Sequence, residues 1–274
     1  MTIGWYPGHM NKARKDIMKI LHNVDLVIEL LDARLPYSSE NPLLNSMIAR
    51  TARIKILNKA DLADPDVTSL WLDAYKARNI TAYALDKSEQ EAIRKTLALA
   101  RRISGKAEDR IVRIMIVGIP NVGKSTYLNT LLNRKAAKVG NEPAVTRAAQ
   151  EINLDGHIKL IDTPGVLWPK IEDQTAAYRL AVSGAIKNTA IEFEDIALFA
   201  LDFLRQDYPA LLQKRYQLAD TDLDARTLLQ HIAEKRGCLR KGGVDFHKAS
   251  EILLNDFRSG ALGRISLEKP DLLL

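Results

Sequence analysis

Apolar residues in the first part of the chain occur in short runs that are separated by helical patterns. The runs predict strands, because each is mostly apolar and stops at a polar turn; they cover residues 24–31, 53–57, 80–85, 112–117, 150–154 and 157–161. Helical patterns lie at residues 40–50, 66–78, 88–104 and 124–133. Strands that alternate with helices predict an α/β fold with a doubly wound, mostly parallel sheet. The last two strands flank Asp155-Gly156, which predicts a hairpin between them.

After about residue 172 the spacing of apolar residues changes to that of helices. One such set is Ile196, Phe199, Ala200, Phe203 and Leu204. We therefore expect two domains, an α/β domain over residues 1–172 and a smaller, all-helical C-terminal domain over residues 173–274. Gly242-Gly243 is expected to end one helix before Asp245 caps the next.

The charge of the chain is mildly basic and unevenly distributed. The net charge is +6, and basic residues gather at 10–22, 94–113 and 230–248. Any one of these runs alone is typical of a solvated helix face, but together they favour a polyanionic partner, namely RNA rather than DNA. No apolar run is long enough to span a bilayer and the N-terminal residues lack a secretory pattern, so we expect a cytoplasmic protein without a membrane partner.

A phosphate-binding loop follows the strand at 112–117. Gly118-Ile-Pro-Asn-Val-Gly123-Lys124-Ser125 has the glycine spacing and the Lys-Ser pair of this motif, and it lies between a predicted strand and a predicted helix. Backbone N–H groups would surround the β-phosphate, Lys124 would reach the β- and γ-phosphates, and Ser125 would bind Mg²⁺. The expected nucleotide contacts here are Pro120, Asn121, Val122, Gly123, Lys124, Ser125 and Thr126.

Two further segments suit a nucleotide hydrolase. Asp162-Thr-Pro-Gly165 follows the strand at 157–161, where an acid can hold Mg²⁺ through water and the N–H of Gly165 can contact the γ-phosphate. Thr146 lies between the two motifs and is the candidate switch threonine that ligates Mg²⁺.

Asn58-Lys59-Ala60-Asp61 follows the strand at 53–57 and selects the base. The carboxylate of Asp61 can accept two hydrogen bonds from the N1–H and N2–H₂ groups of guanine, a donor pair that adenine lacks. Asn58 would brace the loop or contact the base, and the stem of Lys59 could cover the ring. This motif disfavours a P-loop kinase or ATPase and predicts GTP as the substrate.

The base motif precedes the phosphate loop, whereas common GTPases have the reverse order. The same site can form from a chain with relocated termini, because ligands bind at the carboxyl ends of the strands. The sequence therefore predicts a circularly permuted GTPase.

The sequence resembles the YlqF/YawG family of circularly permuted GTPases over nearly its whole length. Besides the permuted motifs, the resemblance rests on Trp5-Tyr-Pro-Gly-His9-Met10 with Lys12-Ala13, Asp32-Ala-Arg-Leu-Pro36, Arg236-Gly-Cys-Leu-Arg-Lys-Gly-Gly243 and Asp256-Phe-Arg-Ser-Gly260-Ala-Leu-Gly263. It implies a factor for late assembly of the large ribosomal subunit that contacts ribosomal RNA partly through its helical domain. It also implies a guanine-contacting loop at Ala84, Leu85 and Asp86. Separately, we expect the free protein to be monomeric.

The catalytic group is less evident from the sequence. Many GTPases orient the attacking water with a glutamine after the glycine of the acidic motif, but this chain has Val166 there. Slow intrinsic turnover is expected, with stimulation by the ribosome. The resemblance makes His9 a candidate for orienting water, although it could instead contact RNA phosphate. Asn121 resembles the asparagine of potassium-stimulated GTPases and is a candidate K⁺ ligand. The alternative is an RNA-binding assembly scaffold in which nucleotide is a structural ligand with negligible turnover.

Overall fold

The computed structural model describes residues 8–86, 89–132, 150–155, 157–168, 171–186 and 192–273. The side chains of residues 8–14, 155, 272 and 273 lie outside this description.

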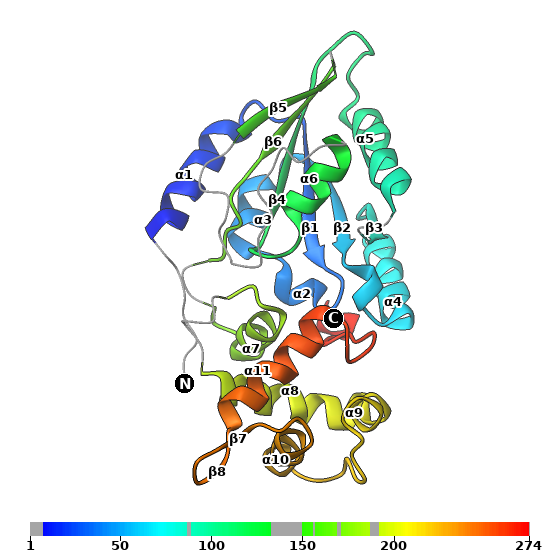
Figure 1. Cartoon of the computed structure of the whole chain (residues 1–274). Helices are drawn as coiled ribbons and strands as arrows, with labels where there is room; N and C mark the ends of the chain where they lie inside the picture. The colour runs from blue at the N-terminus through cyan, green and yellow to red at the C-terminus, as the bar shows by residue number, and fades with distance from the viewer. Residues whose placement is uncertain are drawn as a thin grey trace.

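A six-stranded sheet forms the centre of the first part of the chain (Figure 1). Its strands are β1 (Leu26–Asp32), β2 (Ala52–Asn58), β3 (Ala82–Leu85), β4 (Val112–Gly118), β5 (Gln150–Asp155) and β6 (Ile158–Asp162). The spatial order is β3-β2-β1-β4-β6-β5, and the strands are parallel except β5, which pairs antiparallel with β6. All six predicted strands are present, and β1 and β4 are buried because helices cover the sheet.

Helices alternate with these strands, as the sequence predicted. They are α1 (Gly8–Leu21), α2 (Pro36–Ser39), α3 (Pro42–Ile48), η1 (Ala60–Leu62), α4 (Pro65–Ala77), α5 (Gln90–Ser104) and α6 (Lys124–Leu132). The helix predicted at 40–50 is present as α3, which is shorter than expected and begins at Pro42. Proline disfavours helical backbone in the preceding residue, and Asn41 is extended and caps α3 by accepting hydrogen bonds from two backbone N–H groups.

The last part of the chain is helical, as predicted, and lies below the sheet in Figure 1. Its helices are α7 (Gln174–Ser183), α8 (Phe193–Asp207), α9 (Pro209–Tyr216), α10 (Ala225–Lys235), α11 (Phe246–Ser259) and η3 (Pro270–Leu273). One expectation is corrected. Gly242-Gly243 ends no helix but lies in a small hairpin of β7 (Leu239–Arg240) and β8 (Gly243–Val244), because α10 has already ended before Gly237. Asp245 caps α11 as expected.

One hydrophobic cluster extends from the sheet into the C-terminal helices. It contains Ile28 and Ile116 of the sheet together with Leu180, Leu201 and Leu253 of the helices. A second, smaller cluster lies between β1, β2 and α4 and includes Trp71 and Tyr75. The boundary at 172/173 stays a prediction, since the larger cluster crosses it. Of the helices that the structure describes, none has the length and apolar character required to cross a bilayer.

Candidate functional site

The predicted nucleotide motifs lie at the carboxyl ends of neighbouring strands. Asp32 at the end of β1 is paired in register with Asn58 at the end of β2. Gly118 ends β4 beside β1, and Asp162 ends β6 beside β4. Because these strands are parallel, segments far apart in the sequence meet at one edge of the sheet, which is the edge at which α/β proteins bind ligands.

The phosphate-binding loop connects β4 to α6, which begins at Lys124. Gly118 and Gly123 have φ angles of +154° and +100°. A Cβ atom on Gly118 would lie 2.6 Å from the carbonyl oxygen of Leu30, and one on Gly123 would lie 2.3 Å from Nδ2 of Asn58. Glycine is therefore required at both positions by the strands and loop packed against them. Of the remaining predicted loop contacts, Pro120 and Val122 are buried, and Ser125 and Thr126 are half-buried at the start of α6.

Lys124 is buried within the loop that it would serve. Its Nζ donates to the carbonyl oxygens of Gly118 at 2.9 Å and Ile119 at 2.8 Å. Burial lowers the pKa of Lys124 to about 8, and the nearby carboxylate of Asp162 opposes this shift. The ammonium group is thus held in the loop by two acceptors that a phosphate oxygen could replace.

The acidic motif lies beside the phosphate loop. Oγ1 of Thr163 donates to the carbonyl oxygen of Ile116 at 2.7 Å and fixes the start of the segment against β4. Oδ1 of Asp162 is buried and has no hydrogen-bond partner among the described residues. Burial raises the pKa of Asp162 to about 6, although the ammonium group of Lys124 opposes the shift. A buried, unpaired carboxylate oxygen in this place fits a site for a hydrated cation.

Gly165 is in close contact with the phosphate loop. A Cβ atom on Gly165 would lie 2.8 Å from Cα of Pro120 and 3.0 Å from Nζ of Lys124. The following residue, Val166, is only 3% exposed, and its carbonyl oxygen accepts from Nδ2 of Asn41 at 2.8 Å. Val166 therefore belongs to the hydrophobic core, and its side chain cannot orient a water molecule by hydrogen bonding.

The base motif is attached directly to the phosphate loop. Nδ2 of Asn58 donates to the carbonyl oxygen of Val122 at 2.7 Å, so Asn58 braces the loop as the sequence suggested. Asp61 lies in the short helix η1 with an exposed side chain, which leaves its carboxylate accessible to a ligand. Ala84 and Leu85 end β3 beside β2, and the backbone N–H of Asp86 donates to Glu89 at 3.3 Å.

A buried ion-pair cluster supports the base motif, and no role for it was predicted from the sequence. The guanidinium of Arg34 donates to both carboxylate oxygens of Asp32, at 2.9 and 2.8 Å, and Nζ of Lys59 donates to the same carboxylate at 2.9 Å. Burial opposes ionisation of Asp32, but Arg34 and Lys59 outweigh it and hold its pKa well below the usual value. The sequence signal was the Asp-Ala-Arg-Leu-Pro turn, which contains both Asp32 and Arg34, whereas Lys59 lies 27 positions away from Asp32.

The site also touches the C-terminal helices. Nδ2 of Asn121 donates to the carbonyl oxygen of Gly184, the residue that ends α7, at 2.8 Å. The guanidinium of Arg34 lies over the ring of Phe257 in α11, 4.8 Å from its centroid. The roles of Thr146 and His9 stay predictions. Thr146 lies outside the described residues, and His9 is in α1 but its side chain is not described.

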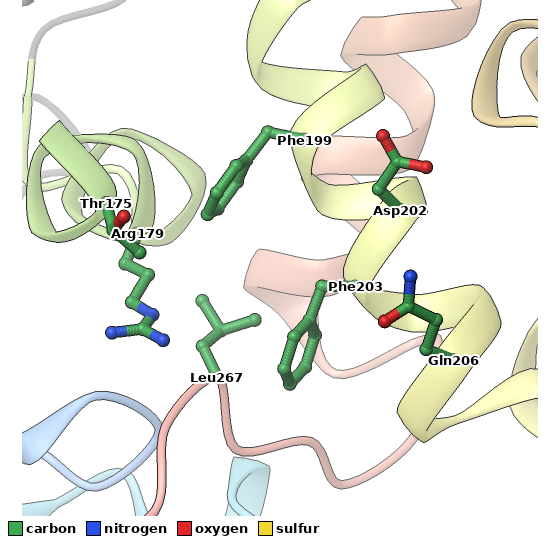
Figure 2. A pocket seen from close by; sticks show the side chains of 7 residues that line it. All are labelled: Thr175, Arg179, Phe199, Asp202, Phe203, Gln206 and Leu267. Carbon is green, nitrogen blue, oxygen red and sulfur yellow. The ribbon is translucent and has the colours of Figure 1, made fainter. Parts of the chain in front are cut away.

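A shallow cavity lies elsewhere, between α7, α8 and the C-terminal segment (Figure 2). Phe199 and Phe203 point from α8 toward Leu267, and Arg179 approaches from α7. None of the predicted nucleotide-binding residues lines this cavity. It is therefore separate from the nucleotide site.

No group of three or more His, Cys, Asp or Glu side chains among the described residues could hold a metal ion. Mg²⁺ in nucleotide sites needs no such group, since phosphate oxygens and water supply most of its ligands. The hydroxyl of Ser125 and the buried carboxylate of Asp162 fit this mode of binding.

Comparisons with known proteins agree with this geometry. Residues 113–236 match the protein family described as "50S ribosome-binding GTPase". Ribosome biogenesis GTPase A of Priestia megaterium (strain DSM 319 / IMG 1521) is 43% identical over 281 residues, covering 98% of this chain and 98% of that protein. Two solved structures are also similar. GDP-bound "TM YlqF" is 29% identical with a TM-score of 0.70, covering 93% of this chain and 99% of that chain. GNP-bound YlqF from T. maritima is 28% identical with a TM-score of 0.69, covering 95% and 99%. The chain belongs to the ribosome biogenesis GTPase A family.

Proposed function

We propose that this chain binds GTP with Mg²⁺ at the carboxyl edge of its sheet and hydrolyses it to GDP and phosphate during late assembly of the large ribosomal subunit. The observation that carries the proposal is the hydrogen bond from Asn58 to Val122, because it joins the base motif to the phosphate loop in a single site. Membership of a ribosome biogenesis GTPase family supports the substrate and the general role.

Binding of the phosphates would use groups that the structure places within the loop. Lys124 would exchange the carbonyl oxygens of Gly118 and Ile119 for oxygens of the β- and γ-phosphates. The N-terminus of α6 and the backbone N–H groups of the loop would face the β-phosphate. Ser125 would bind Mg²⁺ directly, Asp162 through water and Thr146 as the switch ligand. Bound Mg²⁺ neutralises the charge that develops on the phosphate oxygens.

Recognition of guanine would depend on Asp61, with Ala84, Leu85 and Asp86 beside the base. We expect Asp61→Asn to weaken the binding of GTP by about 1 to 3 kcal/mol, because one hydrogen bond of the pair to guanine is left unsatisfied. The variant should gain affinity for xanthosine triphosphate, since an amide can donate to the 2-oxygen of xanthine. Equilibrium binding of both nucleotides tests this, and unchanged GTP affinity would remove Asp61 from the base site.

Catalysis would require a water-orienting group other than Val166, which is buried. Intrinsic GTP turnover should therefore be slow. The group that orients the attacking water would be supplied by His9 or by the ribosome. A K⁺ ion held near Asn121 would stand in for an arginine finger. Replacing K⁺ with Na⁺ at fixed ionic strength should therefore reduce turnover, and an equal rate in both salts would argue against a K⁺ site.

Ribosomal RNA is the partner that the charge distribution favours. The basic side chains of the run at 230–248 are exposed at the end of α10, on the β7–β8 hairpin and in α11; they are Lys235, Arg236, Arg240, Lys241 and Lys248. The family whose model matches residues 113–236 is described as a 50S ribosome-binding GTPase. We propose that the domain over residues 173–274 contacts RNA in a nucleotide-dependent way, and that the free protein is monomeric and cytoplasmic.

The decisive experiment measures GTP turnover in potassium buffer with and without purified large ribosomal subunits. Strong stimulation by the large subunit, and none by the small subunit, would support a ribosome-triggered GTPase. Tight GTP binding without stimulation would support the alternative, an RNA-binding scaffold in which the nucleotide is a structural ligand.

A further inference from the structure

The turn that carries Asp61, at residues 59–63, is bonded to the C-terminal segment, which we define as residues 260–268. Nε of Arg264 donates to the carbonyl oxygen of Ala63 at 2.8 Å, and Nη2 donates to that of Ala60 at 3.0 Å. The backbone N–H of Ile265 donates to the carbonyl oxygen of Leu62 at 3.0 Å. The C-terminal segment thus bonds to the carbonyl groups before and after Asp61.

These bonds matter because the loop has few internal constraints. η1 is a single turn of 3-10 helix, and it begins after Lys59, whose backbone is left-handed with a φ of 62°. A short, partly exposed turn of this kind is mobile unless other groups fix its backbone. The guanidinium of Arg264 is a rigid fork that spans both ends of the turn, so it restricts the direction in which the Asp61 carboxylate points.

The C-terminal segment is itself firmly anchored. The buried carboxylate of Glu268 accepts from the backbone N–H of Ser38 at 2.9 Å and its hydroxyl at 2.6 Å, and from Nη1 of Arg179 at 3.2 Å. Nε1 of Trp71 donates to the carbonyl oxygen of Glu268 at 3.1 Å. Leu267 packs at the cavity between α7 and α8 (Figure 2). Arg264 therefore projects from a fixed backbone toward the loop.

We propose that Arg264 is a positioning residue for guanine recognition, holding the turn that carries Asp61 in the orientation that pairs with the base. The inference rests on the proposed role of Asp61. Preorganisation of this kind increases affinity because the loop does not have to be ordered when the nucleotide binds.

The test is equilibrium binding of GTP and inosine triphosphate to the full chain and to Arg264→Ala. Hypoxanthine lacks the 2-amino group, so it forms one of the two hydrogen bonds that Asp61 offers to guanine. We expect Arg264→Ala to lower the affinity for GTP about 5- to 20-fold and the affinity for inosine triphosphate less. Two hydrogen bonds to one carboxylate depend more on its orientation than a single hydrogen bond does. Arg264→Lys should recover only part of the affinity, since one ammonium group cannot bond to both carbonyl oxygens.

Two controls separate positioning from a general loss of structure. Arg205→Ala removes another surface arginine, which bonds to Asp202 on α8, and should leave both affinities unchanged. The second control repeats Arg264→Ala in an Asp61→Ala background. If Arg264 acts through Asp61, its removal there should change GTP affinity by less than about 2-fold.

A lower ratio of GTP to inosine triphosphate affinity that disappears in the Asp61→Ala background supports the inference. An unchanged ratio, or an equal loss in both backgrounds, overturns it and leaves the base site intact. If Asp61→Ala itself does not weaken GTP, the proposed base site fails and the role of Arg264 fails with it.

Discussion

At the scale of single residues, the site depends on charges that are buried but paired. Asp32 is 1% exposed, and an isolated carboxylate in that place would be strongly unfavourable. It is stabilised by the guanidinium of Arg34 and the ammonium of Lys59. Asp32 therefore contributes to the site by fixing Lys59, which links Asn58 to the turn that carries Asp61.

Asp32→Asn should destabilise the protein by about 3 to 5 kcal/mol, because it leaves the buried Arg34 without a charged partner. Urea denaturation at pH 7 measures the loss. Asp202→Asn is the control, since its salt bridge to Arg205 is partly exposed and should contribute at most about 0.5 kcal/mol. Equal losses in the two variants would contradict the importance of the buried cluster.

The ion pairs of Asp32 with Arg34 and Lys59 make the stability of the protein depend on pH. The pKa of Asp32 is lower in the folded chain than in the unfolded chain, so its ionised form stabilises the fold above the unfolded value and protonation removes that contribution. The free energy of unfolding of the native chain should fall as the pH drops below about 4. The fall should be smaller in Asp32→Asn, whose amide does not titrate.

At the scale of elements, the ends of β2 and β4 form one unit. Asn58 donates to the carbonyl oxygen of Val122, and the lack of a Cβ on Gly123 makes room for the amide. On the other side, Gly165 lies against Pro120. The phosphate loop is thus enclosed between the base motif and the acidic motif, so a change in either neighbour should alter phosphate binding.

Asn58→Asp should weaken binding of GDP more than Asn58→Ala does. A carboxylate at residue 58 would face the carbonyl oxygen of Val122 with no hydrogen to donate, whereas alanine only removes the bond, at about 0.5 to 1.5 kcal/mol. Isothermal calorimetry with GDP measures the difference. Equal affinities in the two variants would show that the bond to Val122 does not shape the loop.

At the scale of the whole molecule, the α/β part and the C-terminal helices share one hydrophobic cluster. Polar contacts also join them: Asn121 bonds to Gly184, Arg34 lies over Phe257, and Arg264 bonds to the turn that carries Asp61. The nucleotide site thus contacts the helical part at its phosphate end and at its base end. Nucleotide binding and the position of the helices should therefore be coupled.

Saturating GTP with Mg²⁺ should stabilise the helices as much as the sheet. At a ligand concentration 100 times the Kd, the gain is about 2.7 kcal/mol, which slows exchange through global unfolding about 100-fold. Hydrogen exchange of the core amides of α8 and α10 measures this against those of β4. Slowing confined to the sheet and phosphate loop would show that the helices unfold on their own.

Much of the fold and of the site could be predicted because its signals are local. The periodicity of β1 to β6 and the spacing of Gly118 to Ser125 are properties of short segments. One error arose where the local signal was short. The β7–β8 hairpin at Gly242-Gly243 has strands of two residues, which is too few to show an alternating pattern.

The sequence by itself determined the order of the strands and helices and the chemistry at the strand ends. A parallel sheet then brings those ends together whichever way the chain is permuted. Only the tertiary structure decided that Arg34 lies over the ring of Phe257, and that Arg264 bonds to the turn around Asp61. Those contacts depend on how the C-terminal helices pack against the sheet. Packing of that kind joins residues about 200 positions apart and leaves no periodic pattern in either segment.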